Sequence, residues 1–438
     1  MIGAVPLSRR SLLCAGLASG VATLSGCGTP AGTTWTAAAS PTPTGTAAPP
    51  TPVPTGPPAY EPALVQTLTR FLGNTPENPK HPTYAGAVAL VSEGGAQRCI
   101  VAVGDALRYG AGPVELPVAK RVAMRTDSIF DLASVTKVYT TILALQQVER
   151  GRLDLAAPVV EYLPGFTGSG KDAITVRMLL THTSGLAVGA KVGGLPDAAA
   201  RRAAVLATPL VAGETAGRTF RYSSVGLMVA AYLVEQVTGQ PLDEALRTGI
   251  TGPLGLRETV FQPTNHIGVA DRDARMVATD ARSSRGLLRG VVHDDVTNVL
   301  GGVAGHAGLF APAGEVAVLG EMLLGGGMYR GVRILAEETL RQMLTNLNVG
   351  LPAIDPDRPG RTADHGLGVE LNQPWFMGGL ASPQTFGHTG FTGTSLLVDQ
   401  HRAVVLVLLT NRAHPNWSWA NPDPMRAAVA NVLAGALP

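Results

Sequence analysis

The sequence predicts an α+β (α/β) fold. One antiparallel β-sheet, built from the N- and C-terminal parts of the chain, is flanked by helices and carries an inserted, mostly helical subdomain. Two observations predict this fold. Apolar runs of strand length gather toward the two ends of the chain, at 84–95, 97–105, 366–371, 386–399 and 402–411. Helical patterns separated by Gly- and Pro-rich loops fill residues 155–340 between them. Strands at both ends around a helical middle imply a single sheet that draws on both termini.

Four further segments define the order of the elements. Residues 61–73 carry apolar side chains at helical spacing, which predicts an opening helix. The pair Gly94–Gly95 separates the first two strand-like runs and predicts a hairpin. Residues 134–151 predict a long helix that ends at Gly151, and residues 423–437 predict a closing helix. No internal repeat is visible.

The composition is that of a large globular protein. The chain has 438 residues, of which 45% are hydrophobic and 15% are charged. That is enough apolar material for a sizeable core, in one large domain or two. The formal net charge is only +2, and the basic residues form no visible run. Nucleic acid and acidic partners are therefore not expected.

The N-terminal 26 residues read as a targeting segment rather than as part of the fold. The stretch SRRSLL, from Ser8 to Leu13, resembles a twin-arginine export signal, and an apolar stretch follows it to about Leu24. That stretch is too short and too rich in small residues for a good membrane span. It ends in LSGC, which resembles a bacterial lipobox and predicts cleavage before Cys27 and lipidation of that cysteine. An ordinary secretory peptide with a chance cysteine is the alternative.

Residues 27–59 are rich in Pro, Thr and Ala and carry no charge, so they predict an extended tether. The globular body is expected to span residues 60–438. Of the three cysteines, only Cys99 falls inside this body. No disulfide is therefore expected after processing, and Cys99 is interpreted as a small buried apolar residue.

The strongest chemical signal is Ser-Val-Thr-Lys, residues 134–137. On a helix, positions i and i+3 lie on one face, so the Ser134 hydroxyl would meet the Lys137 amine. A neutral or desolvated lysine could accept the serine proton. The chain has five lysines, and a short motif of this kind also arises by chance. Alone, it could equally be a helix cap followed by a solvated lysine.

The surrounding segments give the motif a context. In order along the chain, they are FDLASVTKVYTT (130–141), MLLTHTSGL (178–186), FRYSSVGLMVAAYLVE (220–235), the glycine-rich segment 291–327, and FGHTGFTGTSLLVD (386–399). Together they resemble the serine β-lactamase and penicillin-binding protein superfamily. Within it they are similar to the class C-like branch that includes esterase-like and D-alanyl-D-alanine carboxypeptidase-like members. The resemblance covers roughly residues 60–435.

This resemblance implies roles for particular residues. Ser134 would be the acylated nucleophile, and Lys137 and Tyr222 would share the general-base work. A tyrosine can do so only if nearby positive charge lowers its pKa, and Lys137 could supply that charge. The oxyanion hole would consist of the backbone N–H groups of Ser134 and Phe391, which would stabilise the negative charge that develops on the acyl oxygen.

Two positions depart from the family pattern. The second motif ends in Ser224 where the family has asparagine, and a hydroxyl offers fewer hydrogen-bonding atoms than an amide. The third motif, His388–Thr389–Gly390, begins with histidine where many members have lysine. A histidine is only partly charged at pH 7, so it would bind a substrate carboxylate more weakly than a lysine would. His388 therefore argues against an efficient β-lactamase and for an esterase or peptidase.

Other chemistries find little support in the sequence. His182 and His306 lie in family-like loops and are interpreted as makers of structural hydrogen bonds. No His-Glu-x-x-His, no Cys/His cluster, no phosphate-binding loop and no Gly-x-Ser-x-Gly elbow is present. We therefore expect a reaction without a metal and without a cofactor.

The sequence thus predicts an exported serine hydrolase, held on the outer face of the bacterial cell membrane by a lipid on Cys27. It would act through a Ser134 acyl-enzyme on an amide or ester of the cell envelope. The expected partner is a small-molecule or cell-wall peptide substrate. A carboxypeptidase-like and an esterase-like enzyme remain equally open. A penicillin- or peptidoglycan-binding module without turnover is the first alternative, and a β-lactamase is the second.

Overall fold

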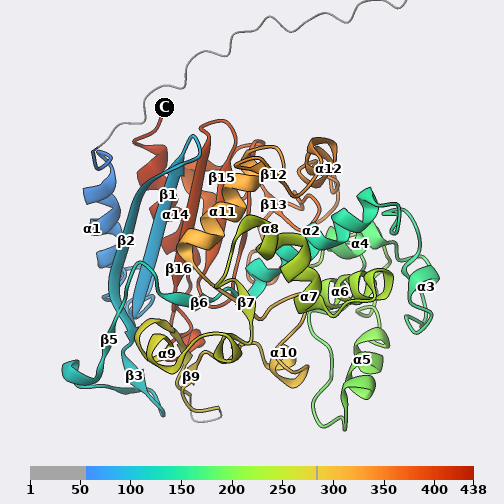
Figure 1. The fold of residues 1–438 in the computed structure, drawn as a ribbon, viewed down its shortest axis with the longest axis horizontal. Helices are drawn as coiled ribbons and strands as arrows, with labels where there is room; N and C mark the ends of the chain where they lie inside the picture. The colour runs from blue at the N-terminus through green and yellow to red at the C-terminus, as the bar shows by residue number, and fades with distance from the viewer. Residues whose placement is uncertain (1–55, 283–284) are drawn as a thin grey trace, which may run out of the picture. The chain divides into compact units, whose positions relative to one another are not determined.

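A seven-stranded antiparallel sheet joins the two ends of the chain, and this confirms the predicted fold class (Figure 1). The computed structural model describes residues 56–282 and 285–438. In spatial order, the strands of the sheet are β13 (Glu370–Leu371), β14 (Thr385–Thr389), β15 (Ser395–Asp399), β16 (Val404–Thr410), β1 (Gly86–Glu93), β2 (Ala96–Leu107) and β5 (Val122–Ala123). The predicted signal peptide, Cys27 and nearly all of the tether lie outside the described residues.

The first strand of the body pairs directly with the last. β1 runs antiparallel to β16, with Ala87 opposite Thr410 and Glu93 opposite Val404. On its other side, β1 pairs with β2 through the predicted hairpin. Both turn residues of that hairpin, Gly94 and Gly95, have positive φ (57° and 81°), a conformation that glycine adopts without steric cost.

Helices cover both faces of this sheet (Figure 1). Residues Ala87, Ala89 and Val91 of β1 pack with α1 (Glu61–Arg70) and α14 (Asp423–Ala434) in one apolar cluster. Residues Val88 and Leu90 belong to the cluster on the opposite face, which includes α11 (Ala313–Leu324). Because side chains alternate between two buried faces, the strand reads as a continuous apolar run.

The middle of the chain is mostly helical, as expected. Its helices, besides α11, are α2 (Thr136–Glu149), α3 (Val159–Tyr162), α4 (Val176–Leu180), α5 (Ala198–Leu206), α6 (Ser224–Thr238), α7 (Leu242–Leu246), the π-helical turn η3 (Arg247–Thr251), α8 (Gly252–Leu254), α9 (Val269–Arg275), α10 (Asp295–Val299) and α12 (Glu337–Met343). A short helix, α13 (Pro374–Met377), precedes β14. The 3₁₀ turns are η1 (Val118–Lys120), η2 (Ala133–Val135), η4 (Pro263–Asn265), η5 (Gly378–Leu380) and η6 (Trp417–Trp419).

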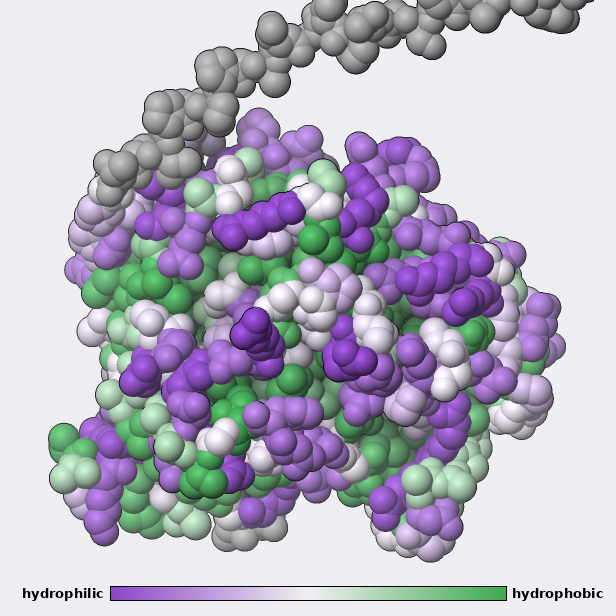
Figure 2. All heavy atoms as spheres, viewed as in Figure 1, coloured by the Kyte–Doolittle hydropathy of each residue, from purple (hydrophilic) through white to green (hydrophobic). Residues whose placement is uncertain are grey.

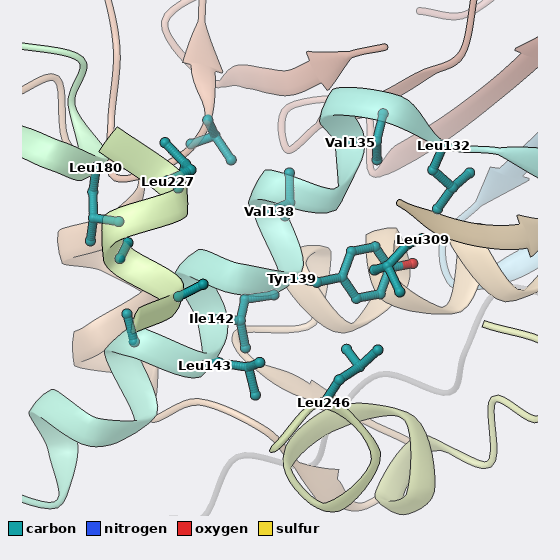
Figure 3. Packing of buried hydrophobic residues seen from close by; sticks show 14 of the residues in the cluster. Leu132, Val135, Val138, Tyr139, Ile142, Leu143, Leu180, Leu227, Leu246 and Leu309 are labelled. Atoms are coloured by element: carbon teal, nitrogen blue, oxygen red, sulfur yellow. The ribbon is translucent and has the colours of Figure 1, made fainter. Parts of the chain in front are cut away.

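Helix α2 lies in the interior of the protein, and nearly every residue of it is buried. Figure 3 shows Val138 and Ile142 on this helix, with Leu227 of α6 and Leu309 of β10 (Leu309–Pro312) among the neighbouring side chains. These residues belong to one apolar cluster that also includes residues of the sheet. The surroundings of α2 hold its N-terminal end in a fixed position.

Several short strands were not expected from the sequence. β6 (Ile129–Asp131) precedes α2 in the chain. It forms a three-stranded sheet with β10 and β7 (Val260–Phe261), in which β10 is the central strand. Three two-stranded ribbons complete the set, namely β3–β4 (Tyr109–Gly110 and Val114–Glu115), β8–β9 (Ala278–Asp280 and Leu288–Arg289) and β11–β12 (Met328–Tyr329 and Val332–Arg333). Such short strands are too brief to show an alternating pattern.

The predicted strand at 366–371 is largely wrong, because only the two residues of β13 pair there. Gly368 has a φ of 65°. A Cβ atom at that position would lie 2.7 Å from Thr141 Cβ. The segment therefore bends close to α2 in a backbone conformation that a regular strand does not adopt.

Figure 2 shows hydrophilic and hydrophobic residues intermixed over one face of the protein. Among the described residues, no helix is both long enough and apolar enough to cross a membrane.

The contact between α11 and the sheet gives a first prediction. A Cβ atom at Gly320 would lie 2.5 Å from Val405 Cγ1 and 3.0 Å from Leu396 Cδ1. We expect Gly320→Ala to lower the free energy of unfolding by about 1–3 kcal/mol through overpacking. Gly314, in the same helix, has open space around it. Gly314→Ala should be neutral or stabilising by up to about 1 kcal/mol. Urea unfolding of both variants measures this, and equal effects would contradict the packing described.

Candidate active site

Ser134 and Lys137 meet at the start of α2. Ser134 belongs to the 3₁₀ turn η2, and Lys137 lies in the first turn of the α-helix. The Lys137 Nζ atom is 2.8 Å from Ser134 Oγ and 2.9 Å from the carbonyl oxygen of His306. The structure therefore brings the predicted nucleophile and its amine into hydrogen-bond contact.

The Lys137 side chain is fully buried, with 0% of its surface exposed. Its hydrogen-bond partners are a hydroxyl and a carbonyl, neither of which carries a charge. Burial lowers the pKa of the amine to about 7, although the charges of Asp294 and Glu370 act in the opposite direction. A large share of the Lys137 amines is therefore neutral at pH 7 and able to accept a proton.

Tyr222 reaches the same serine from the segment that precedes α6. Its hydroxyl donates a hydrogen bond to Ser134 Oγ at 2.8 Å, and Lys137 Nζ lies 5.0 Å from the centre of its ring. Burial raises the pKa of Tyr222 above its ordinary value, despite the lowering effect of the hydrogen bond with Ser134. The expectation that Lys137 lowers this pKa is wrong, because burial of the phenol outweighs every interaction that lowers it.

His388 lies on β14 and is buried. Its Nδ1 atom is 2.7 Å from the carbonyl oxygen of Thr389. Burial, and after it the charge of Lys137, holds the pKa of His388 well below its ordinary value. The expectation of partial charge at pH 7 is therefore wrong, because the imidazole has lost the water that would stabilise its charged form. His388 therefore offers a neutral ring at the start of the third motif.

Gly390 allows the strand to pass close to the nucleophile. A Cβ atom at this position would lie 2.5 Å from the carbonyl oxygen of Leu132, two residues before Ser134. Hydrogen bonds fix this approach. Thr392 Oγ1 donates to the Asp131 carbonyl at 2.7 Å, and Thr394 Oγ1 donates to the Leu132 carbonyl at 2.9 Å. The loop after β14 and the turn before α2 therefore form one unit.

The two amides predicted for the oxyanion hole lie on the two sides of this contact. Within residues 56–282 and 285–438, neither the Ser134 N–H nor the Phe391 N–H donates a hydrogen bond to a protein acceptor. Arg426 of α14 donates from Nη2 to the Gly390 carbonyl at 2.7 Å and so holds the strand end from behind. Both amides are consequently available to a negatively charged oxygen.

A buried carboxylate shapes the turn that carries Ser134. Asp131 accepts hydrogen bonds from the backbone N–H of Ala133 at 2.9 Å and of His293 at 2.7 Å. Ala133 has a φ of 47°, a left-handed conformation that costs an L-residue about 1–2 kcal/mol. Burial raises the pKa of Asp131 to about 6, although both hydrogen bonds oppose this. Asp131 is a positioning residue whose part the sequence did not reveal.

The remaining predicted residues surround this centre. Ser224 is the first residue of α6, and a hydrogen bond between its side chain and Tyr222 lowers the tyrosine pKa slightly. His182 accepts a hydrogen bond from the Ser223 N–H at 3.1 Å and lies against the Tyr222 ring. His306 Nε2 is 3.0 Å from Asp294 Oδ1. The structural hydrogen bonds expected of both histidines are confirmed.

The sequence did not show that Arg412 lies beside the candidate active site. It follows β16 and donates a hydrogen bond from Nη1 to the Phe391 carbonyl at 3.2 Å, with its guanidinium 4.8 Å from the centre of the Phe391 ring. Burial lowers its pKa only to about 10, so it is charged at pH 7. Among the described residues it forms no ion pair. The ring of Phe391 is exposed, and on it lies the exposed ring of Trp417, with the two ring centres 5.6 Å apart.

Cys99 is buried in β2, as predicted, and burial raises the pKa of its thiol to about 11. In the part of the chain that the structure describes, no three His, Cys, Asp or Glu side chains are placed to share one metal ion. The expectation of a metal-free and cofactor-free reaction stays a prediction.

Comparisons with known proteins identify the family of the chain. The family model described as "Beta-lactamase" matches residues 82–431, so the chain belongs to the β-lactamase family. A protein of Escherichia coli (strain K12) named "Putative D-alanyl-D-alanine carboxypeptidase" is 34% identical in an alignment of 344 positions, which covers 71% of this chain and 74% of that protein. A homologue from Escherichia coli O157:H7 with the same name is also 34% identical, over 68% of this chain and 72% of its own.

Solved structures show the same fold. A penicillin-binding protein homologue from Caulobacter crescentus superposes with a TM-score of 0.62 at 19% identity, over 87% of this chain and 98% of that one. EstCE1, titled a hydrolase with promiscuous acyltransferase activity, gives a TM-score of 0.58 at 23% identity, over 84% and 98% of the two chains. The chain is therefore similar in sequence and fold to hydrolases of the β-lactamase and penicillin-binding protein type.

The pKa shifts of Lys137 and Tyr222, the two groups in contact with Ser134, predict which of them acts as the base. The rate at which a fluorophosphonate labels Ser134 should rise with pH through a midpoint near 7, the pKa of Lys137. Tyr222→Phe should lower that rate by about 10²-fold while leaving the midpoint in place, and Lys137→Ala should abolish the pH dependence in this range. Intact-protein mass spectrometry at a series of pH values measures both. A midpoint that disappears with Tyr222→Phe would assign the base to tyrosine and contradict this account.

Proposed function

We propose that this protein is a serine hydrolase that works through an acyl-enzyme on Ser134, and that its reaction is of the D-alanyl-D-alanine carboxypeptidase type. One observation carries the proposal. The Ser134 Oγ atom is held between Lys137 Nζ and the Tyr222 hydroxyl, each 2.8 Å away. A serine with one buried amine and one hydroxyl donor is equipped to lose its proton as it attacks a carbonyl.

In the acylation step, Ser134 Oγ forms a bond to the acyl carbon while the neutral Lys137 amine takes the hydroxyl proton. The electron pair of the carbonyl moves to its oxygen. The N–H groups of Ser134 and Phe391 would stabilise that oxygen, since such donors cost no reorganisation when they are already in place. When the intermediate collapses, the bond to the leaving amine breaks. The amine takes the Tyr222 proton, and the Lys137 ammonium then restores the tyrosine hydroxyl.

Deacylation uses the same groups. A water molecule gives a proton to Lys137 and attacks the ester carbon, and Ser134 leaves with the proton returned from the amine. The sum of both steps is one amide and one water converted to an acid and an amine. An ester would follow the same course with an alcohol as the leaving group, so the chemistry of the centre accommodates either substrate.

The substrate class is argued from charge. The relatives are named putative D-alanyl-D-alanine carboxypeptidases, and this name supports a peptide substrate whose leaving residue bears a free carboxylate. His388 is neutral, and the third motif offers no other cation. Arg412 is a charged guanidinium beside Phe391, without a carboxylate partner among the described residues. We therefore assign recognition of the substrate carboxylate to Arg412, with the apolar part of the substrate against Phe391 and Trp417.

Covalent labelling tests the nucleophile. We expect a fluorophosphonate to add to the protein once and the adduct to be absent in Ser134→Ala, because only an activated hydroxyl reacts. The same protein should then release D-alanine from an acylated D-Ala-D-Ala peptide and hydrolyse a chromogenic cephalosporin slowly or not at all. A folded protein that accepts neither a fluorophosphonate nor a penicillin would contradict the hydrolase and support a binding module without turnover.

The role of Arg412 is tested with paired substrates. Arg412→Gln should lower kcat/KM for a peptide with a free C-terminal carboxylate by about 10- to 100-fold, the loss expected for a charge-assisted hydrogen bond. The matched C-terminal amide should be affected little, and a short acyl ester should report that Ser134 still reacts. Arg341→Gln, a change at an exposed residue of α12, serves as the control. Equal losses with the acid and the amide would contradict carboxylate recognition.

We also propose that the enzyme is exported and anchored by a lipid on Cys27. The lipobox-like LSGC and the uncharged segment up to residue 59 support this proposal. Metabolic labelling with a fatty acid tests it, since label that persists in Cys27→Ala would place any lipid elsewhere.

A further inference from the structure

The backbone of Gly305 and His306 lies against the first turns of α2. The Thr140 hydroxyl donates a hydrogen bond to the Gly305 carbonyl at 2.7 Å, and Lys137 Nζ donates to the His306 carbonyl at 2.9 Å. A Cβ atom at Gly305 would lie 2.6 Å from Ala231 Cβ on α6. The segment therefore passes closely between two helices and brings one carbonyl oxygen to the catalytic amine.

The side chain of His306 joins this carbonyl to a carboxylate. His306 is 2% exposed, and its Nε2 atom lies 3.0 Å from Asp294 Oδ1. A carboxylate oxygen is an acceptor only, so the ring proton is on Nε2. The same Oδ1 atom accepts a hydrogen bond from the Thr297 N–H at 2.7 Å, at the start of α10. Asp294 thus holds the residue whose carbonyl holds Lys137.

The negative charge of Asp294 is not neutralised by His306. Burial lowers the pKa of His306, although the hydrogen bond with Asp294 opposes this, so the ring is neutral at pH 7. Burial acts to raise the pKa of Asp294, but the hydrogen bond from His306 and other interactions hold it well below its ordinary value. The pair therefore carries one negative charge, and within residues 56–282 and 285–438 Asp294 has no lysine or arginine partner.

This charge acts on Lys137. Burial lowers the pKa of Lys137, and the charges of Asp294 and then of Glu370 oppose it. Glu370 is buried and pairs with Arg361 at 2.9 Å, so a cation offsets its charge. The other titratable groups around Lys137 are uncharged at pH 7, namely His182 after α4, Tyr222 before α6 and His388 of β14. Among the described residues, Asp294 is thus the carboxylate that acts on Lys137 without a cation to offset it.

We propose that Asp294 is a positioning residue for Lys137, which fixes the His306 carbonyl that binds the amine and sets, through its own charge, the pH at which Ser134 becomes reactive. The proposal rests on the proposed function, because it takes Lys137 as the base. A base is most effective when its proton affinity matches the working pH. Without Asp294, burial would make Lys137 neutral over a wider range of pH but also a weaker base.

Removal of the charge at constant geometry tests this role. Asp294→Asn keeps an oxygen that can cap α10 and accept the His306 proton. The midpoint for fluorophosphonate labelling of Ser134 should move down by about half a pH unit or more, because a nearby negative charge favours the ammonium form. Asp294→Glu restores the charge and should return the midpoint toward that of the unmodified protein. Intact-protein mass spectrometry over a series of pH values measures all three proteins.

The neighbouring carboxylate supplies the control. The Asp295 side chain is 75% exposed and pairs with Arg285. Asp295→Asn should leave the midpoint unchanged, and a shift as large as that of Asp294→Asn would overturn the proposal. A lower labelling rate at every pH with an unchanged midpoint would also overturn it, since that result describes a merely structural role.

NMR titration of the Lys137 amine in Asp294→Asn provides a readout that needs no reaction at Ser134. We expect the amine to titrate at a lower pH than in the unmodified protein, and an equal titration would overturn the proposal. If Asp294→Asn does not fold, Asp294→Ser takes its place, because serine also caps helices well. An unmodified protein that a fluorophosphonate does not label would contradict the proposed function, and the NMR titration would then decide the role of Asp294 alone.

Discussion

The chemistry of the candidate active site depends on the burial of one amine, that of Lys137. An ammonium group taken out of water without a carboxylate partner is unstable, so the lysine sheds its proton near pH 7. That one consequence makes the amine a base for Ser134. Burial of the phenol likewise explains why Tyr222 retains its proton, because desolvation is the largest effect on its pKa. The protonation states of Lys137 and Tyr222, the two groups in contact with Ser134, both follow from desolvation.

The large sheet and its helices serve to place this set. Helix α2 is surrounded by apolar side chains, so its N-terminal turn has little freedom (Figure 3). From the other side, the end of β14 is held against that turn by Thr392 and Thr394, and Gly390 permits the close approach. Asp131 fixes the backbone of the turn itself. Within the described residues, the N–H groups of Ser134 and Phe391 find no protein acceptor, whereas the neighbouring carbonyls of Asp131, Leu132 and Gly390 accept hydrogen bonds.

Much of this could be predicted from the sequence, and the failures have physical causes. The sheet, its hairpin and the long helix follow from apolar periodicity and from Gly94–Gly95. Helical spacing predicted the contact of Ser134 with Lys137, and the family resemblance implied the contact with Tyr222. The protonation states of Tyr222 and His388 were misjudged, because burial cannot be read from residue type. Arg412 carries no motif, and its position beside Phe391 appears only when β14 and β16 are assembled in the sheet.

The most direct test of this account is the titration of the Lys137 amine itself, followed by NMR of protein labelled at the lysine side chains. The chain has only five lysines, and a Lys137→Ala sample identifies the signal. We predict a pKa near 7 for this amine in the folded protein, and a pKa of about 8 for the amine of the buried Lys171. A pKa for Lys137 close to 10 would contradict the claim that desolvation makes it the base.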